Sequence, residues 1–246
     1  GGLADGLYFP WDADDAIARK VCEIENTDSY RTDDFVLEGG SIHVDGEGTL
    51  LTTEMCLLSE GRNPHMSREE IERTLGDDLN VEKIIGVTDG IDPDETTGHV
   101  DDVACFVRPG EVACIWTDDA ENPFYEQCQA AYRTLSAATD AKGRPLRVWK
   151  LTMPKKPTLL RGAETIDRVD SACPREDGEI CIASYMNFLI VNGGVIVPQY
   201  GDEYDALALE QIQEMFPERR AVGVYSTEIV YGGGNIHCIT QQQPRG

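Results

Sequence analysis

Cys238 is the residue whose setting most strongly suggests chemistry. It ends the segment GGNIHC at residues 233–238, which nearly repeats GGSIHV at residues 39–44. In an internal repeat, a thiol in place of valine indicates a scaffold position converted to chemistry. The small residues before it, with Gly234 and Asn235 as candidate substrate contacts, would let backbone amides approach a substrate closely. Cys238 is the first candidate nucleophile; the alternative is a flexible turn followed by a buried strand cysteine.

A second segment, GHVDD at residues 98–102, offers a base and an anion together. At the start of a strand, alternation would send His99 and Asp101 to the same face. A histidine can move protons for a thiol near neutral pH, and a carboxylate can hold a cationic group. The alternative is a solvated strand entry with acidic residues.

Glu38 precedes the first glycine pair and is the third candidate. A carboxylate there could orient an imidazole or pair with a guanidinium, although alone it is only a polar strand residue. His43 and His237 occupy equivalent repeat positions. We expect both to be structural, bonding backbone carbonyls within the hairpin.

Composition limits the class of partner. The 246 residues include 21 basic and 45 acidic side chains, a formal charge of −24, which disfavours nucleic acid and anionic lipid and favours a small cation. No apolar run approaches the roughly 20 residues of a membrane span, and no signal peptide is visible. Eight cysteines without a C-x-x-C pair, and scattered histidines, argue against a metal site and for a reducing, cytoplasmic compartment.

The pattern of apolar runs and turn residues predicts an α/β chain with three repeats of strand, strand, helix, strand. A strand at each end would lie outside these units, the last at residues 235–240. The expected strands are 35–44, 49–58, 81–87, 99–107, 111–116, 146–151, 180–191, 195–199 and 221–225. The expected helices are 67–75, 123–138 and 204–216, the first opened by a Ser67 capping box. Residues 153–178 are expected to form a long surface loop with one helical turn, within a single domain of residues 1–246.

The three motifs, at residues 37–43, 98–101 and 233–242, together resemble the agmatine deiminases, the plant form most of all. The similarity runs from about residue 1 to residue 244. It implies the pentein fold of the guanidine-modifying superfamily, an α/β propeller of about five ββαβ modules. It also implies hydrolysis of agmatine to N-carbamoylputrescine and ammonia, in putrescine biosynthesis, by a homodimer without a metal or organic cofactor.

The resemblance assigns roles to the matched residues. Cys238 matches the nucleophile that forms an amidino-cysteine intermediate, and His99 matches the acid and base. Asp101 matches a guanidinium-binding carboxylate, and Glu38 matches the carboxylate that pairs with the guanidinium or steadies His99. These roles agree with the physical expectation that a planar cation is held by carboxylates.

The chain departs from the family pattern in one respect. The family carries an earlier Arg-Asp-x-Gly-Pro segment whose aspartate also binds the guanidinium, and this sequence has none. With three units instead of about five, we expect an open propeller, incomplete at its amino terminus, that is marginally stable, aggregates or depends on the missing part. Two alternatives stay open: an inactive acidic module that binds cationic amines, and a deiminase for another guanidine such as arginine.

Overall fold

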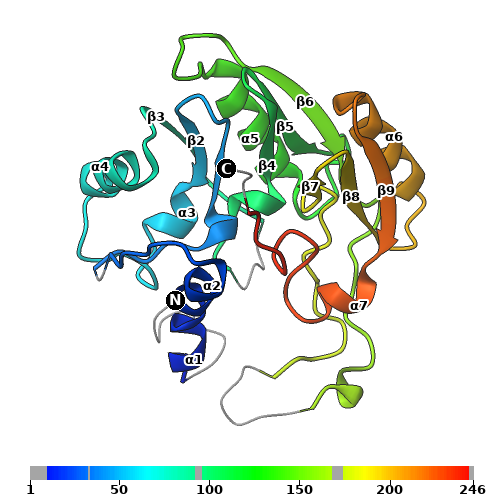
Figure 1. Cartoon of the computed structure of the whole chain (residues 1–246). Coiled ribbons are helices and arrows are strands. Elements are labelled where there is room, and N and C mark those ends of the chain that lie inside the picture. Colours follow the sequence, from blue (N-terminus) through cyan, green and yellow to red (C-terminus); the bar gives the residue numbers. More distant parts are fainter. Residues whose placement is uncertain (1–9, 33, 92–95, 168–173, 244–246) are drawn as a thin grey trace.

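The computed structural model describes residues 10–32, 34–91, 96–167 and 174–243. Three consecutive ββαβ modules dominate it, each built on a three-stranded sheet (Figure 1). In every sheet the first two strands are antiparallel and the third runs parallel to the second. The predicted order of strand, strand, helix, strand is confirmed in all three units.

The elements of each module follow in chain order. The first module contains β1 (Ile42–Val44), β2 (Thr49–Thr53), α4 (Arg68–Leu79) and β3 (Lys83–Val87). The second contains β4 (Ala104–Arg108), β5 (Glu111–Trp116), α5 (Tyr125–Ala137) and β6 (Arg147–Thr152). The third contains β7 (Leu189–Val191), β8 (Gly194–Gln199), α6 (Asp205–Met215) and β9 (Arg220–Tyr225).

Short helices connect or flank the modules. They are α1 (Asp12–Asp15), α2 (Ile17–Glu25), the 3-10 helix η1 (Gly39–Ser41), α3 (Glu54–Leu57), the 3-10 helix η2 (Val100–Asp102), the 3-10 helix η3 (Ala163–Thr165) and α7 (Thr227–Val230). Within segment 153–178, η3 is the one regular element in the part that the structure describes, and residues 168–173 lie outside that part. No helix among the described residues is long and apolar enough to span a membrane.

The central strand of each module supplies the core. In β5, Val112, Ala113, Cys114 and Ile115 have no exposed surface, because β4 and β6 pair with both edges and α5 packs against the sheet. A strand buried on both faces reads as a continuous apolar run, which is why its bounds could be predicted. The largest cluster of buried side chains extends from this sheet into the third module.

Helix α4 shows how local sequence sets an element's start. The Ser67 hydroxyl accepts a hydrogen bond from the Glu70 amide (3.2 Å), and the Ser67 amide donates to the Glu70 carboxylate (2.8 Å). The predicted capping box is therefore confirmed. The helix continues past the predicted end at residue 75 and ends at Leu79. The next residue, Asn80, adopts a left-handed conformation with φ 54°. Its inner face, including Ile71, closes a small separate cluster of buried side chains.

Several predicted strands are wrong in extent. The run predicted as strand 49–58 turns into α3 after Thr53, whose hydroxyl accepts from the Cys56 amide and caps that helix. Of the predicted strands 35–44 and 180–191, only their last three residues are strand, as β1 and β7. The terminal strands outside the units are absent from the described residues: α1 and α2 lie at one end, and residues 236–239 form turns at the other.

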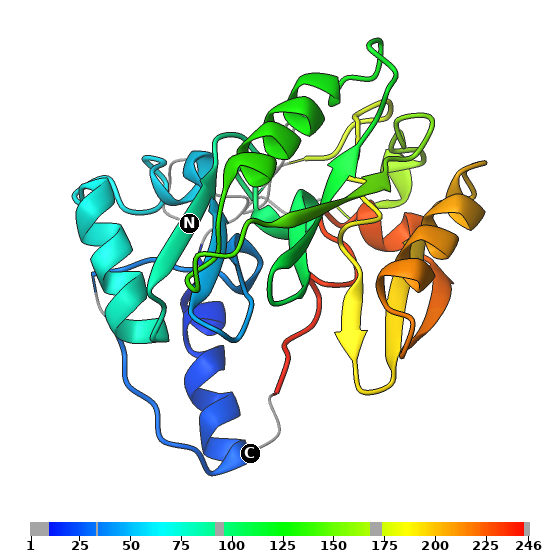
Figure 2. The same cartoon turned by 90° about the horizontal axis from the view of Figure 1, so that it is seen from above.

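The modules lie side by side and leave the C-terminal segment between them. Figures 1 and 2 show α4 and α6 at opposite outer edges, while the red segment after α7 runs between the first and third modules. Near its end, the Gln243 side chain donates a hydrogen bond to Glu25 of α2 (2.6 Å). This path brings Cys238 to the loops that precede β1, β4 and β7.

Candidate active site

Gly40 provides the close approach around which the site is built. A Cβ atom at this position would lie 2.7 Å from His99 Nδ1 and 2.8 Å from Asp101 Oδ2. Such distances are far below van der Waals contact, so only glycine lets η1 pack against these two side chains. The first glycine motif and the His-x-Asp motif therefore meet, as their candidate roles require.

His99 does not begin a strand, which corrects the expectation for residues 99–107. It is the residue before η2, and β4 starts only at Ala104. His99 and Asp101 therefore do not share a strand face, although their side chains still converge next to Gly40. The turn is set up by Thr97 and Gly98, both with positive φ, and the Gly98 carbonyl accepts from the Thr53 hydroxyl (2.5 Å).

The surroundings of His99 favour its protonated form. The side chain is buried, and its Nε2 lies 3.5 Å from Glu38 Oε1. Burial alone would lower the pKa of His99, but contact with Cys56, the hydrogen bond with Glu38 and the charge of Asp101 together raise it to about 10. At neutral pH this imidazolium is a proton donor.

Glu38 links His99 to a buried arginine that sequence reasoning missed. Arg62 Nε lies 2.7 Å from Glu38 Oε2, and the Arg62 side chain is only 3% exposed. Burial would raise the pKa of Glu38, but hydrogen bonds with His99 and Arg62 outweigh it and hold this pKa at about 2. Glu38 is thus an ionised carboxylate between two cationic side chains, a geometry suited to orienting His99.

Asp101 combines a satisfied oxygen with an unsatisfied one. It is 3% exposed; Oδ2 lies 2.8 Å from His237 Nδ1 and 3.5 Å from Cys238 Sγ. Its Oδ1 is buried with no hydrogen-bond partner among the described residues. A buried carboxylate oxygen without a donor is costly. A cationic N–H donor arriving there would remove that cost.

Cys238 lies in the turn of residues 236–239, beside Gly234. A Cβ on Gly234 would lie 3.2 Å from Cys238 Cβ, so this glycine leaves room for the candidate nucleophile. The cysteine is exposed on one side, while its sulfur faces Asn187 and the carboxylates. Crowding by protein atoms, then the charges of Asp102 and Asp101, raise the pKa of the thiol well above its usual range. Because one side of Cys238 is open to solvent, we attribute its raised pKa to the two carboxylates more than to burial.

Asn235 points away from the sulfur. Its Nδ2 donates to the Tyr200 hydroxyl (2.5 Å), its Oδ1 accepts from the Ile236 amide (2.9 Å), and the residue is 1% exposed. These contacts hold the loop to the third module. The Asn235 side chain therefore does not face the sulfur, whereas its backbone is hydrogen-bonded to the Cys238 thiol and Gly234 lies against Cys238. The substrate contacts expected of Gly234 and Asn235 stay predictions.

The two repeat histidines differ in surroundings. His43 accepts a hydrogen bond from the Phe106 amide (3.2 Å) of the next module, so the expected bond to carbonyls within its own hairpin is wrong. Burial, and then the charge of His237, lower the pKa of His43 to about 4, so it is neutral. His237 instead contacts Asp101, which places its ring in the candidate site.

Two groups of potential metal ligands form among the described residues. Glu38, Cys56 and His99 make one, and Asp101, Asp102 and Cys238 make the other; each set keeps its ligand atoms within 4.8 Å. In the first, Arg62 and the protonated His99 already balance Glu38. The second carries negative charge that a guanidinium cation would also neutralise.

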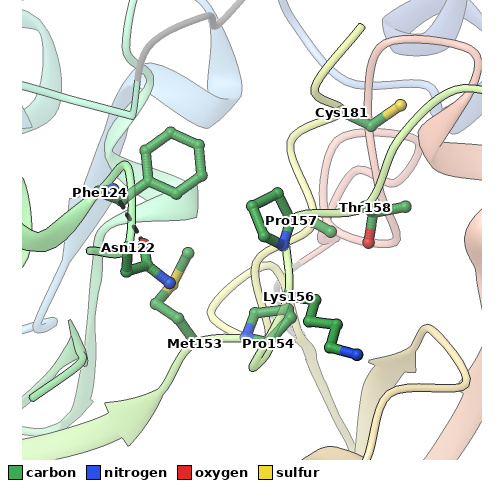
Figure 3. A pocket seen from close by; sticks show the side chains of 9 residues that line it. Asn122, Phe124, Met153, Pro154, Lys156, Pro157, Thr158 and Cys181 are labelled. Carbon is green, nitrogen blue, oxygen red and sulfur yellow. Dashed lines mark hydrogen bonds between the residues drawn. The ribbon is translucent and has the colours of Figure 1, made fainter. Parts of the chain in front are cut away.

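The hollow drawn in Figure 3 does not belong to this constellation. Phe124, Met153, Pro157 and Cys181 are among its lining residues. Lys156 is the one charged side chain in that lining, which makes the hollow unsuited to a cationic ligand. The candidate active site is therefore the cluster around Cys238.

Comparison with known proteins supports one family throughout. The family model described as Porphyromonas-type peptidyl-arginine deiminase matches residues 2–244. A Lactococcus lactis protein, provisionally named an agmatine deiminase, is 71% identical over 245 residues, which are 100% of this chain and 67% of that protein. The Pseudomonas aeruginosa agmatine deiminase is 56% identical over 246 residues, covering 99% of this chain and 67% of its own length.

A solved structure agrees in fold. The agmatine deiminase of Enterococcus faecalis, solved in the course of its reaction, superposes with a TM-score of 0.97 at 68% identity and covers 100% of this chain and 67% of its own. This chain therefore spans about two thirds of the length of these relatives. It has the pentein fold and belongs to the Porphyromonas-type peptidyl-arginine deiminase family and, within it, to the agmatine deiminases.

Proposed function

We propose that this chain carries the site that hydrolyses agmatine to N-carbamoylputrescine and ammonia through an amidino-cysteine intermediate. The observation that carries the proposal is the meeting of Cys238 Sγ with Asp101, whose Oδ1 is buried without a donor. A guanidinium supplies planar N–H donors and a positive charge to such an oxygen. The relatives named for agmatine support this substrate.

Substrate binding would activate the nucleophile. In the unliganded site the two carboxylates favour the neutral thiol, because they raise the pKa of Cys238. A guanidinium held by Asp101 would offset that charge and lower this pKa, so the proton leaves to solvent when the cation is in place. The thiolate then attacks the guanidinium carbon.

His99 would move protons in both halves of the reaction. With a pKa of about 10 it starts protonated and donates to the departing nitrogen, which leaves as ammonia. The neutral imidazole then takes a proton from water as that water attacks the amidino carbon. Breaking the carbon–sulfur bond, with loss of the remaining hydroxyl proton to solvent, forms the carbonyl of N-carbamoylputrescine and restores the thiolate. Glu38, fixed by Arg62, would keep the imidazole oriented.

Cellular setting and assembly are further parts of the proposal. Seven described cysteines are free, which supports the reducing cytoplasm. The charge of −24 supports a small cation over nucleic acid as partner. The homodimer rests on the family resemblance, and light scattering on the purified protein would refute it by giving a monomer mass.

The decisive assay incubates the purified protein with agmatine or arginine. Ammonia and N-carbamoylputrescine are measured, with Cys238→Ala as the control. We expect turnover of agmatine that is lost in the control. Agmatine binding without product in the natural protein would favour the acidic binding module, and faster turnover of arginine would favour an arginine deiminase.

A further inference from the structure

Asn187 occupies the space behind the candidate nucleophile. It lies in the irregular segment before β7 and has no exposed surface. Its carboxamide reaches Asp102, Cys238 and the backbone of residues 237–238. A buried polar side chain at the reacting sulfur is not accounted for by packing alone.

The contacts determine which way the amide faces. Oδ1 accepts from the His237 amide (2.8 Å) and the Cys238 amide (3.3 Å), and both of these are obligatory donors. Nδ2 must then face the other side, where it lies 3.1 Å from Asp102 Oδ1 and 3.2 Å from Cys238 Sγ. All four hydrogen-bonding positions of the carboxamide are used, and a flipped amide would set donor against donor.

This arrangement gives the sulfur a donor. The carboxylates of Asp101 and Asp102 both disfavour a charge on Cys238, whereas an N–H group directed at the sulfur favours the thiolate. Asp102 accepts the second N–H of the same amide and so helps to hold the first one on the sulfur. The carbonyl oxygen, through two backbone amides, fixes the turn that carries Cys238.

We propose that Asn187 is a further catalytic residue, which donates a hydrogen bond to the Cys238 thiolate and holds the nucleophile turn in register. The proposal rests on the proposed function for the identity of the nucleophile. It predicts that Asn187 acts on the reactivity of the sulfur and leaves substrate binding nearly untouched.

Asn187→Asp keeps the shape and the accepting oxygen but replaces the N–H donor with a second oxygen, and its carboxylate adds a negative charge beside the sulfur. A matched double variant, Asn187→Asp with Asp102→Asn, restores a donor and acceptor pair between the two positions. It still leaves the sulfur without its donor at position 187. The double variant thus distinguishes a role of Asn187 in holding the fold together from a role in stabilising the Cys238 thiolate.

The measurement is the pH dependence of alkylation of Cys238 by iodoacetamide, followed by mass spectrometry of its peptide in the natural protein. We expect both variants to move the midpoint to higher pH and to slow alkylation at neutral pH about tenfold or more, as loss of a hydrogen bond to a charged group implies. With agmatine, kcat should fall similarly and KM should change little.

An unchanged alkylation midpoint in a folded variant would overturn the proposal. If Asn187→Asp does not fold, circular dichroism should show the double variant folded, and its midpoint decides the matter. If neither variant folds, the alkylation midpoint is measured in Asn187→Ala. The pH at which the Cys238 thiolate forms in the wild type is read from its ultraviolet absorbance, with Cys238→Ala as the blank. Alkylation needs no agmatine, so the two proposals can fail separately. If the alkylation midpoint shifts in the Asn187 variants but the wild type does not hydrolyse agmatine, only the proposed function is refuted.

Discussion

Replacing Gly40 with alanine tests whether the glycine motif exists to let η1 approach the side chains of the candidate site. The added Cβ would lie 2.7 Å from His99 Nδ1 and 2.8 Å from Asp101 Oδ2, whereas ordinary contact begins at 3.4 Å. His99 must therefore move by about 0.7 Å and Asp101 by about 0.6 Å to relieve both contacts. Both side chains are buried and cannot swing into solvent.

That displacement sets the expected loss of activity. A misplacement of about 1 Å costs on the order of 100-fold in rate, so a movement of about 0.7 Å predicts a fall in kcat/KM of roughly 10- to 100-fold. Gly39→Ala is the matched control: its Cβ meets only Gln241 Oε1, at 3.4 Å. Neither glycine has a positive φ, so alanine introduces no backbone strain at either position.

The assay compares kcat/KM for agmatine hydrolysis in wild type, Gly39→Ala and Gly40→Ala, with thermal unfolding of each. The control should stay close to wild type in both. If Gly40→Ala keeps kcat/KM within about threefold of Gly39→Ala, the side chains are not held as tightly as described and the geometric reasoning fails.

Three further outcomes follow from the described contacts. Arg62→Met should leave the half-buried Glu38 carboxylate without one of its two cationic partners, lower the free energy of unfolding by roughly 1–3 kcal/mol and reduce kcat/KM by about 10-fold or more. Urea titration and steady-state rates check both, and unchanged values would remove Arg62 from the site. Because folding raises the pKa of His99 from 6.5 to about 10, its stabilisation is complete below pH 6.5 and is lost as pH rises through about 10. The difference in unfolding free energy between wild type and His99→Gln should shrink over that interval, and a constant difference would contradict the raised pKa. Ser67→Ala removes an exposed cap of the outer helix α4 and should cost about 1 kcal/mol of stability with kcat unaltered; a fall in kcat would show that α4 supports the site.

Local sequence was enough for elements whose signals are local. The β5 run from Val112 to Ile115 is apolar because the strand is buried on both faces, and the Ser67 capping box uses atoms three residues apart. Where contacts with distant residues decide the backbone conformation, prediction from the local sequence was wrong. Residues 236–239 look like a strand but form a turn, because Asn187 binds their amides from another part of the chain.

The sequence by itself determined the candidates: Cys238 from the repeat, His99 and Asp101 from their motif, and Glu38 from its place before the glycines. Residue type and spacing were sufficient to name them because a thiol, an imidazole and carboxylates are themselves the groups that the proposed chemistry requires. Only the tertiary structure decided that Arg62 holds Glu38, that His237 faces Asp101 and that Asn187 touches the sulfur. Hydrogen bonds between residues more than twenty positions apart depend on tertiary packing within and between the modules, and no local pattern records that packing.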